Sequence, residues 1–535
     1  MASRTTTTNP LIALSDLSAC TDAASVLALF RRLRYLVEPE AVAVPLESGD
    51  LPESLHEGIA ARYLIARVSG APSMDVTLFA LGDPARQAAL VRGISQIWTR
   101  KFAGNHLLVF AAPGANGDFE RITFVSTERL GEGAQVRVKL RKLIVERRHP
   151  TRHDADILSR VALSPSAPAD AAACYKAQLD AFNVERITND FYRGYSRLFH
   201  AVLKRIQEDN AHIHLPEGRP WHRTFTQRLF GRLMFLYFLQ KKGALNGDPS
   251  FISEWYARAA RNGENFYVDV LTPLFFETLN QPREGARSPK FGRVPYLNGG
   301  LFAPDGDLPK DIVVANELFD RQSPDGLLYF LDNHNFTVAE DTPLEVEVAL
   351  DPEMLGKVFE NLLEAEERGQ SGTFYTPRQV VAFMCRESLA AYLERTTGLD
   401  AERLGWLLDE AETGEPARDD ADAERLTYHN LSYALHQRIE QALLAVRVLD
   451  PAVGSGAFPL GMLALLVGVR RALYRIRENK IEPHSRLIED WKRAFIRDCL
   501  YGVDIKPEAI EIARLRLWLS LVVDADPFDM EPLPN

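Results

Sequence analysis

The first third of the chain alternates short apolar runs with polar turns. A segment of helical spacing starts at Asp16 and runs to Tyr35, and it predicts one amphipathic helix. Four runs rich in β-branched and aromatic residues follow, and they read as strands: DVTLFAL (75–81), HLLVFAAP (106–113), RITFVST (121–127) and VRVKLRKLIVE (136–146). The pattern predicts a mixed α/β domain over residues 1–162, of which a nuclease-like fold is one form.

A helical period replaces this pattern after a Pro-, Ser- and Ala-rich stretch at 163–173, which reads as a linker. Residues 181–206 repeat apolar positions every three to four residues. Residues 224–245 form an apolar run that ends in Lys-Lys-Gly, a good C-terminal stop for a helix. We therefore expect a helical connector domain over residues 163–365.

The last part of the chain changes again, to strand, glycine turn and helix. A β-rich run leads into DPAVGSGAF (450–458), and a second strand leads into Asp504 and a helix that starts near Pro507. Two helical segments, 464–480 and 485–498, lie between them. The order is typical of an α/β sheet, so residues 366–535 are expected to form the N-terminal part of a Rossmann-like domain.

Composition adds limits to this picture. The chain has 535 residues and a net charge of −11, with 46% hydrophobic residues, as in ordinary globular proteins. Its four cysteines form no CxxC pair, so neither a zinc site nor a disulfide framework is expected. The polar start, MASRTTTTNP, precedes no long apolar run, which predicts a cytoplasmic protein without a signal peptide or membrane span. The basic stretch 138–153 is either a solvated strand end or a phosphate-facing patch.

The glycine turn carries the clearest chemical signal. Gly454 and Gly456 can adopt positive φ and let a ligand approach bare backbone. The helix starting near Phe458 offers unpaired N–H groups beside them. This is the general design of a nucleotide-cofactor site at the carboxyl end of a strand.

The neighbouring residues narrow the choice of nucleotide. Gly456 is followed by Ala457 and Phe458 rather than by Lys and Ser or Thr, which argues against a P-loop. The third glycine of GxGxxG is not in place, which leaves an NAD-dependent oxidoreductase as a weak alternative. The Asp450 carboxylate would repel a pyrophosphate and would suit a cationic ligand. S-adenosylmethionine carries both a sulfonium and an ammonium group.

Two further segments support the same interpretation. Asp504 ends the second strand, where a carboxylate is expected to hold ribose hydroxyls. Upstream, GTFYTPRQVV (372–381) begins with an aromatic turn in which Thr376 suits the N-cap and Pro377 the first helical position. The start of that helix would favour a ligand carboxylate.

In this order, GTFYTPRQVV, DPAVGSGAF and YGVDIKPEAIEIARLRLWLSL resemble motifs X, I and II of adenine-specific DNA methyltransferases, in the gamma-class order. The chain is most similar to the large single-chain methylases of type IIG restriction–modification and phage-defence systems. The resemblance covers roughly residues 181–535 and also takes in LGKVFENLL, PYLNGGLF and RLMFLYFLQKKG, which are similar to helical segments that precede motif X.

The resemblance implies a role for each motif residue. Asp450, Ala452, Gly454, Ser455 and Gly456 match the S-adenosylmethionine loop of motif I. Asp504 matches the acid that holds the ribose, and Ile505 would lie against the adenine ring. Motif X closes the methionine end of the cofactor, and its residues here are Tyr375, Thr376 and Pro377.

The sequence departs from the family in two ways. The family's catalytic Asn/Asp/Ser-Pro-Pro-Tyr/Phe motif, which lines the pocket of the flipped adenine, is absent, since no Pro-Pro occurs anywhere. The target-recognition part is also missing, so no catalytic residue is assigned to this chain. Some members carry an N-terminal metal nuclease, but no Glu-x-Lys or Asp-x-Lys follows Asp75 within the N-terminal α/β domain, and no metal site is expected.

Two hypotheses follow. The first is a DNA adenine methyltransferase of a bacterial restriction–modification or phage-defence system, with double-stranded DNA as substrate. This chain would then be one part of the enzyme, and a C-terminal continuation or a separate chain would carry the rest. The second is a catalytically inactive scaffold or DNA-binding subunit of a defence complex, in contact with other subunits.

Overall fold

The computed structural model describes two compact units, each taken here by itself. The first comprises Met1–Phe191, Asp332–Asn335 and Leu344–Leu350, and the second comprises Tyr192–Leu331, Phe336–Pro343 and Asp351–Asn535. The described residues are 10–526 except 132–135, 164–169, 216–220, 284–286, 298–301, 305, 307, 310, 338–344, 353–375, 415–432 and 479–484. The division of the chain into three domains at residues 162 and 365 stays a prediction.

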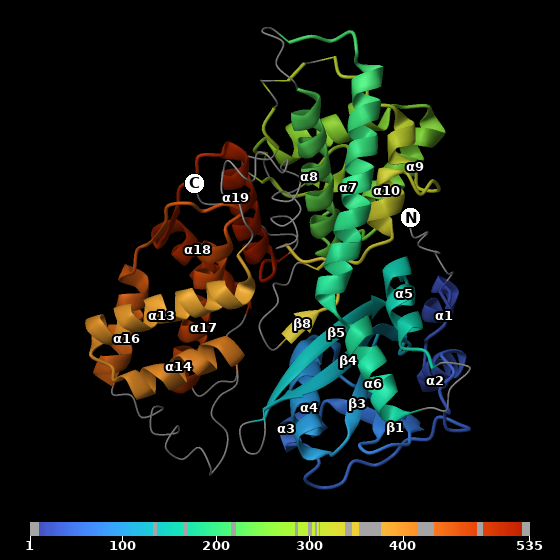
Figure 1. Cartoon of the computed structure of the whole chain (residues 1–535), viewed down its shortest axis with the longest axis vertical. Helices are drawn as coiled ribbons and strands as arrows, with labels where there is room; N and C mark the ends of the chain where they lie inside the picture. Colours follow the sequence, from blue (N-terminus) through green and yellow to red (C-terminus); the bar gives the residue numbers. More distant parts are fainter. Residues whose placement is uncertain are drawn as a thin grey trace, which may run out of the picture. The chain divides into compact units, whose positions relative to one another are not determined.

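A six-stranded mixed sheet forms the centre of the first unit, in the order β1-β2-β3-β4-β5-β8 (Figure 1). The pairs β2–β3 and β5–β8 are parallel, and the other three are antiparallel. The mixed α/β architecture predicted for this part of the chain is therefore confirmed, and the four predicted strands are present as β2 to β5. The strands are β1 (Ile59–Val68), β2 (Met74–Leu81), β3 (Asn105–Pro113), β4 (Phe119–Leu130), β5 (Arg137–Glu146) and β8 (Glu345–Glu347).

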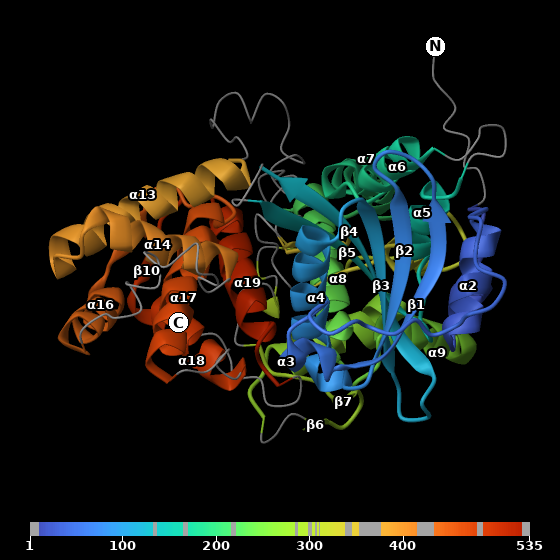
Figure 2. The ribbon, with the colours of Figure 1, turned by 90° about the horizontal axis from the view of Figure 1, so that it is seen from below.

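Helices cover both faces of this sheet (Figure 2). Successive strand residues point to opposite faces, and in β2 the side chains of Val76 and Leu78 join one apolar cluster whereas Phe79 and Leu81 join another. The first cluster also takes residues from α1, α2, α5 and α6, and the second from α4. The helices described between Leu14 and Ala181, including the short α3 and η1, are α1 (Leu14–Ser18), α2 (Ala23–Arg32), α3 (Glu53–His56), η1 (Pro84–Arg86), α4 (Gln87–Lys101), α5 (Arg152–Arg160) and α6 (Ala171–Ala181).

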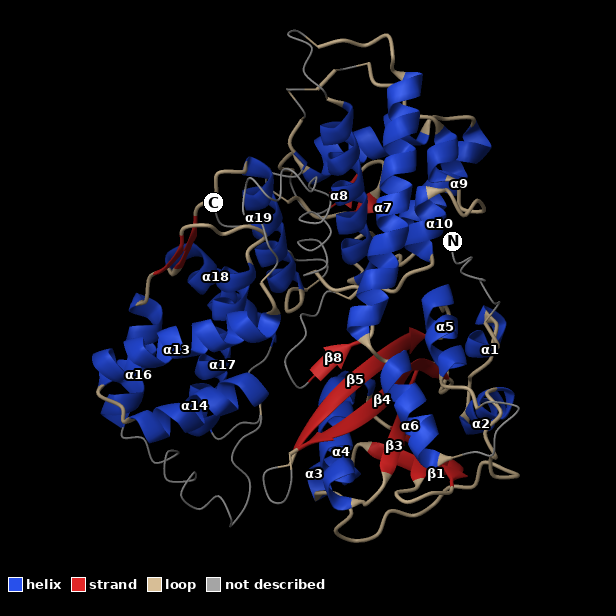
Figure 3. Cartoon of the chain, in the orientation of Figure 1, coloured by secondary structure: helices blue, strands red, loops and turns tan. Residues whose placement is uncertain are grey.

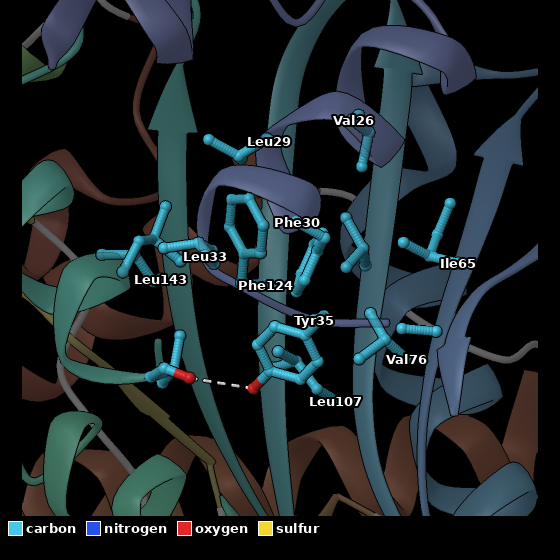
Figure 4. Packing of buried hydrophobic residues seen from close by; sticks show 14 of the residues in the cluster. Val26, Leu29, Phe30, Leu33, Tyr35, Ile65, Val76, Leu107, Phe124 and Leu143 are labelled. Atoms are coloured by element: carbon cyan, nitrogen blue, oxygen red, sulfur yellow. Dashed lines mark hydrogen bonds between the residues drawn. The ribbon is translucent and has the colours of Figure 1, made fainter. Parts of the chain in front are cut away.

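The larger cluster joins the N-terminal helices to the sheet (Figure 4). Phe30 of α2 is fully buried, with its ring centroid 6.4 Å from that of Phe124 on β4. Tyr35 is also buried, and its hydroxyl donates a hydrogen bond of 2.9 Å to the carbonyl oxygen of Val161. The phenol is thus satisfied inside an apolar core, which keeps its burial from being costly.

The single helix predicted from Asp16 to Tyr35 is wrong. The structure has two helices there, because Asp22 starts a new one: its side chain accepts a hydrogen bond from the backbone N–H of Ser25 at 2.8 Å. The linker predicted at 163–173 is also partly wrong, because α6 already starts at Ala171 with Asp170 as its N-cap.

The second unit is mainly helical (Figure 3). Its described elements are α7 (Val184–Asp209, which starts in the first unit), α8 (His222–Lys241), α9 (Phe251–Asn262), η4 (Phe266–Leu271), η5 (Pro273–Leu279), β6 (Arg287–Ser288), β7 (Gly292–Arg293), η7 (Asn316–Phe319), α10 (Leu327–Asp332), α13 (Arg378–Thr397), α14 (Ala401–Thr413), α16 (Tyr433–Ala445), β9 (Val448–Asp450), α17 (Ala457–Glu478), α18 (Ser485–Asp498), β10 (Leu500–Gly502) and α19 (Pro507–Val522).

The helical middle region confirms one prediction in detail. The apolar helix α8 ends at Lys241, and Gly243 follows with φ of +82°, as the Lys-Lys-Gly stop predicts. The segment around PYLNGGLF reads in sequence as a turn-rich loop, although it is similar to a helical segment of the family; its residues 295–297 form no helix, and Phe302 lies in a 3-10 turn. LGKVFENLL lies outside the described residues.

Helix α17 is the core helix of the C-terminal part of the second unit. It packs against α13, α14, α16 and α18 in one apolar cluster. Within the described residues, its segment Ala457–Arg475 is long and apolar enough to cross a membrane by those two criteria, but 61% of that segment is buried inside the fold. Burial among other helices accounts for its apolar composition.

Candidate functional site

The two strands predicted to carry cofactor residues lie side by side. β9 and β10 pair in parallel, with Asp450 opposite Gly502. The backbone N–H of Val503 donates to the carbonyl oxygen of Asp450 at 2.9 Å. The backbone N–H of Val453 donates to the carbonyl oxygen of Val503, also at 2.9 Å. Because the strands are parallel, both carboxyl ends lie at the same edge, and the segments containing Asp450 and Asp504 meet there.

The Asp504 carboxylate is held by backbone groups of both segments. Its Oδ2 accepts a hydrogen bond of 2.8 Å from the N–H of Gly454, and its Oδ1 accepts one of 2.9 Å from the N–H of Lys506. Each carboxylate oxygen can accept a second hydrogen bond. The carboxylate is therefore fixed in orientation and retains acceptor capacity for a ligand.

The Asp450 carboxylate has a different environment. Its Oδ1 accepts a hydrogen bond of 3.1 Å from the N–H of Ala452. Its Oδ2 is buried and has no hydrogen-bond partner among the described residues. A buried carboxylate oxygen without a partner is costly, so a cationic or hydrogen-donating ligand group would stabilise this site.

The glycine turn has the backbone conformation that its sequence predicts. Gly454 has φ of +50° and Gly456 has φ of +84°, in a region of backbone conformation that residues other than glycine rarely adopt. A Cβ on Gly456 would also lie 3.0 Å from the Cβ of Ala513 in α19. The turn then leads into α17, where the N–H of Leu460 donates to the carbonyl oxygen of Gly456 at 3.1 Å.

Ser455 is buried and directed toward a residue that sequence reasoning did not single out. The guanidinium of Arg516 in α19 donates to the backbone oxygen of Ser455 at 2.7 Å and lies 3.3 Å from its hydroxyl oxygen. Arg516 is itself 3% exposed. An arginine inside the apolar run ARLRLWLSLVV was the available signal, because buried arginines are rare unless paired. Arg516 thus holds the glycine turn through its hydrogen bond to the backbone of Ser455.

The start of α13 differs from the prediction. The helix begins at Arg378, so Pro377 occupies the N-cap position and Thr376 lies before it, and no side chain caps the helix. Arg378 instead pairs with the buried carboxylate of Asp351. Tyr375 lies outside the described residues.

Helix α13 packs across the beginning of α17. A Cβ on Gly461 would lie 2.6 Å from Cγ1 of Val381, and the Cys385 Sγ lies 3.7 Å from the carbonyl oxygen of Phe458. Helices α13 and α17 thus share one core. Among the described residues, one hydrogen bond joins Ala452 to Asp450 and another joins Gly454 to Asp504. None of the hydrogen bonds of these residues joins Thr376 or Pro377 to the glycine turn.

Apolar side chains are exposed on and beside the two short strands. Ile505, next to the Asp504 carboxylate, is 99% exposed. Leu449, Tyr501 and Val503 are 62%, 47% and 56% exposed. Parallel strands in proteins are ordinarily buried on both faces, so this surface has the character of one that another group covers.

The first unit shows no comparable site in its described part. Asp75 of β2 forms a two-pronged ion pair with Arg67 of β1, at 2.8 and 2.9 Å, and no group of three or more metal-ligating side chains is present among the described residues. In the basic stretch 138–153, Arg141, Lys142 and Arg148 pair with acidic side chains. These ion pairs neutralise part of the positive charge of the stretch, and the choice between a solvated strand end and a phosphate-facing patch stays open.

Comparisons with known proteins give one relative in sequence. No protein-family model matches the chain. A protein of Methanocaldococcus jannaschii, provisionally named a type II restriction enzyme and methyltransferase, is 28% identical over 375 residues, which are 64% of this chain and 30% of that protein.

Among solved structures, the Type IIL restriction–modification enzyme MmeI in complex with DNA aligns with 62% of this chain and 36% of its own, at 17% identity and a TM-score of 0.35. That score is too low to establish a shared overall fold. The chain spans about a third of the length of each protein that it matches. In sequence, it is similar to a restriction–modification methyltransferase.

Proposed function

We propose that the chain is part of an S-adenosylmethionine-dependent DNA adenine methyltransferase of a restriction–modification or phage-defence system. The observation that carries the proposal is the joint geometry of the glycine turn and the two strand-end carboxylates. Gly454 donates to Asp504, while Asp450 keeps a buried oxygen that has no hydrogen-bond partner in the part of the chain that the structure describes. Sequence similarity to the Methanocaldococcus protein supports the restriction–modification setting.

The residues present fit this cofactor. The orphaned Asp450 Oδ2 suits the ammonium end, and Asp504, fixed by two backbone donors, suits the ribose hydroxyls. The exposed Ile505 would cover the adenine ring, with Ala452, Gly454, Ser455 and Gly456 supplying backbone contacts. Tyr375, Thr376 and Pro377 would close the methionine end. When bound, the cofactor supplies an electrophilic methyl group on its sulfonium.

The chain's own contribution is to bind and orient that methyl donor. The sequence has no Pro-Pro motif with which to hold a flipped adenine. We therefore assign adenine binding and DNA recognition to a C-terminal continuation or a separate chain. The exposed apolar side chains of β9 and β10 support this, because added strands and helices would cover them. The enzyme would act on double-stranded DNA in the cytoplasm, with other defence subunits as further partners.

Cofactor binding by the chain alone tests the proposal. Calorimetric titration with S-adenosylmethionine should show one saturable site, and Asp450→Ala should weaken it at least about tenfold. Radiolabelled methyl groups should reach adenine in DNA only after the missing catalytic region is supplied, as a longer chain or as a second protein. Absence of cofactor binding in both forms would refute the proposal.

The second candidate is a catalytically inactive scaffold or DNA-binding subunit of a defence complex. The absence of a Pro-Pro motif favours it. It predicts that Asp450→Ala leaves partner and DNA binding unchanged and that no added segment restores methylation. Methylation by the reconstituted pair would rule it out.

A further inference from the structure

A small cavity lies between α16, α17 and α18, and it shares no residue with the Asp450–Asp504 site. Its volume is about 180 Å³, whereas one water molecule needs about 10–15 Å³ of such space. We propose that this cavity binds a small oxyanion, such as inorganic phosphate or a short carboxylate. The cavity is lined by His436, Glu440, Arg470, Tyr474, Arg477, Leu487 and Trp491.

Two buried polar atoms in this lining have no hydrogen-bond partner among the described residues. They are Nε of Arg470 and Nε2 of His436, and His436 is only 6% exposed. An unsatisfied buried donor costs about 1–3 kcal/mol. An oxyanion in the cavity would accept from the guanidinium and, in the suitable tautomer, from the imidazole.

The charged side chains that line the cavity sum to one positive charge. Arg470 and Arg477 each contribute +1 and Glu440 contributes −1, while burial lowers the pKa of His436 and keeps it neutral at pH 7. The Glu440 carboxylate oxygens lie 3.9 Å from Nε of Arg470 and 3.8 Å from Nη1 of Arg477. The distance to Nε of Arg470 exceeds that of a hydrogen bond, so Glu440 attracts the Arg470 guanidinium without accepting a hydrogen bond from Nε.

Aromatic side chains hold the Arg470 guanidinium in place. Its central carbon lies 4.7 Å from the ring centroid of Trp491 and 5.9 Å from that of Phe495. Tyr474 packs edge-on against Trp491 with ring centroids 5.9 Å apart. A guanidinium fixed in this way loses little conformational entropy when it binds an anion. Because His436 is only 6% exposed, the site suits a free small anion better than a phosphate of duplex DNA.

Titration of the full chain with inorganic phosphate at constant ionic strength tests the proposal, with sodium acetate as a second probe. Calorimetry should show one saturable site for phosphate that sodium chloride does not mimic. Arg470→Gln should weaken binding at least about tenfold. The matched control is Arg497→Gln, which removes an equal charge from the exposed side of α18, where Arg497 pairs with Asp498.

A second variant keeps the test decisive if Arg470→Gln fails to fold. Glu440→Gln removes the negative charge from the cavity and should tighten phosphate binding severalfold, which an unfolded chain cannot do. No saturable binding of either anion, or equal affinity in Glu440→Gln and the unmodified chain, would overturn the proposal. Displacement of phosphate by a short DNA duplex would overturn the assignment to a free small anion. None of these outcomes depends on S-adenosylmethionine binding.

Discussion

The backbone N–H of Gly454 lies 2.8 Å from Oδ2 of Asp504, so the turn after β9 is hydrogen-bonded to the segment that follows β10. The bond joins residues that are 50 positions apart in sequence. The Asp504 carboxylate therefore has two roles. It fixes the conformation of the glycine turn, and its remaining lone pairs can accept hydrogen bonds from a ligand. A change at Asp504 acts on both.

Asp504→Asn is expected to weaken S-adenosylmethionine binding at least about tenfold, or about 1.4 kcal/mol. The amide keeps the size of the side chain but loses the charge and one acceptor. Calorimetry measures the affinity, and circular dichroism checks the fold. Asp498→Asn, on the exposed end of α18, is the matched control and should bind normally. Unchanged affinity in Asp504→Asn would contradict the role of this carboxylate.

Gly456→Ala should destabilise the second unit and abolish cofactor binding. Positive φ costs an alanine about 1–2 kcal/mol, and the new Cβ would also lie 3.0 Å from the Cβ of Ala513. Gly398→Ala separates the two effects, since Gly398 has φ of +71° with open space around it. Urea unfolding should show the larger loss for Gly456→Ala. Equal losses of unfolding free energy in the two variants would mean that α19 shifts to accommodate the added methyl group.

Glu345→Gln should destabilise the first unit by about 3 kcal/mol, because it removes the buried carboxylate that pairs with the mostly buried Lys142 and with the more exposed Arg92. Burial alone would raise the pKa of Glu345, but Lys142 and Arg92 outweigh it and hold the pKa below its usual value. This stabilisation is present above pH about 4.3, the unfolded value, and is lost as the pH falls through the folded pKa. Glu120→Gln breaks an exposed pair with Arg148 and should cost under about 1 kcal/mol. Urea titrations at pH 7 and pH 4 check both variants.

The four thiols should react slowly in the folded chain. Burial, helped by the Asp450 carboxylate, raises the pKa of Cys385 to about 11, and burial also raises the pKa values of Cys20, Cys174 and Cys499. Their contribution to stability is complete below pH about 8.5, the unfolded value, and is lost as the pH rises toward the folded values. A thiol-reactive dye at pH 8 should label all four rapidly only in denaturant. Rapid labelling of the native chain would show that the thiols are accessible.

The sequence predicted the strands and the strand–turn–helix units because their signals are local. Asp450, Gly454 and Gly456 stand in a pattern whose backbone conformation depends mainly on nearby residues, and the structure has the expected turn. The sequence placed the N-cap of α13 one residue too early: the N-cap is Pro377, and Arg378 at the start of the helix pairs with the distant Asp351. No local pattern contains that contact.

Long-range pairing explains what else was missed. Nothing in the apolar segment around Arg516 says that its guanidinium reaches Ser455, 61 positions earlier in sequence. β1 was missed although IAARYLIARV has strand character, and β8 has only three residues. The oxyanion cavity likewise depends on three helices meeting, which no single segment encodes.

The pairing of β8 with β5 affects how the protein is made. Lys142 of β5 and Glu345 of β8 are 203 residues apart, and a ribosome adding about 5–20 residues per second needs roughly 10–40 s to cover that distance. During this time the nascent sheet has an open edge at β5. Arg137, Lys139 and Arg141 lie along that strand, and edge lysines and arginines discourage pairing with other chains. The positive charge of β5 is therefore expected to disfavour pairing of this open edge with other chains until β8 is synthesised.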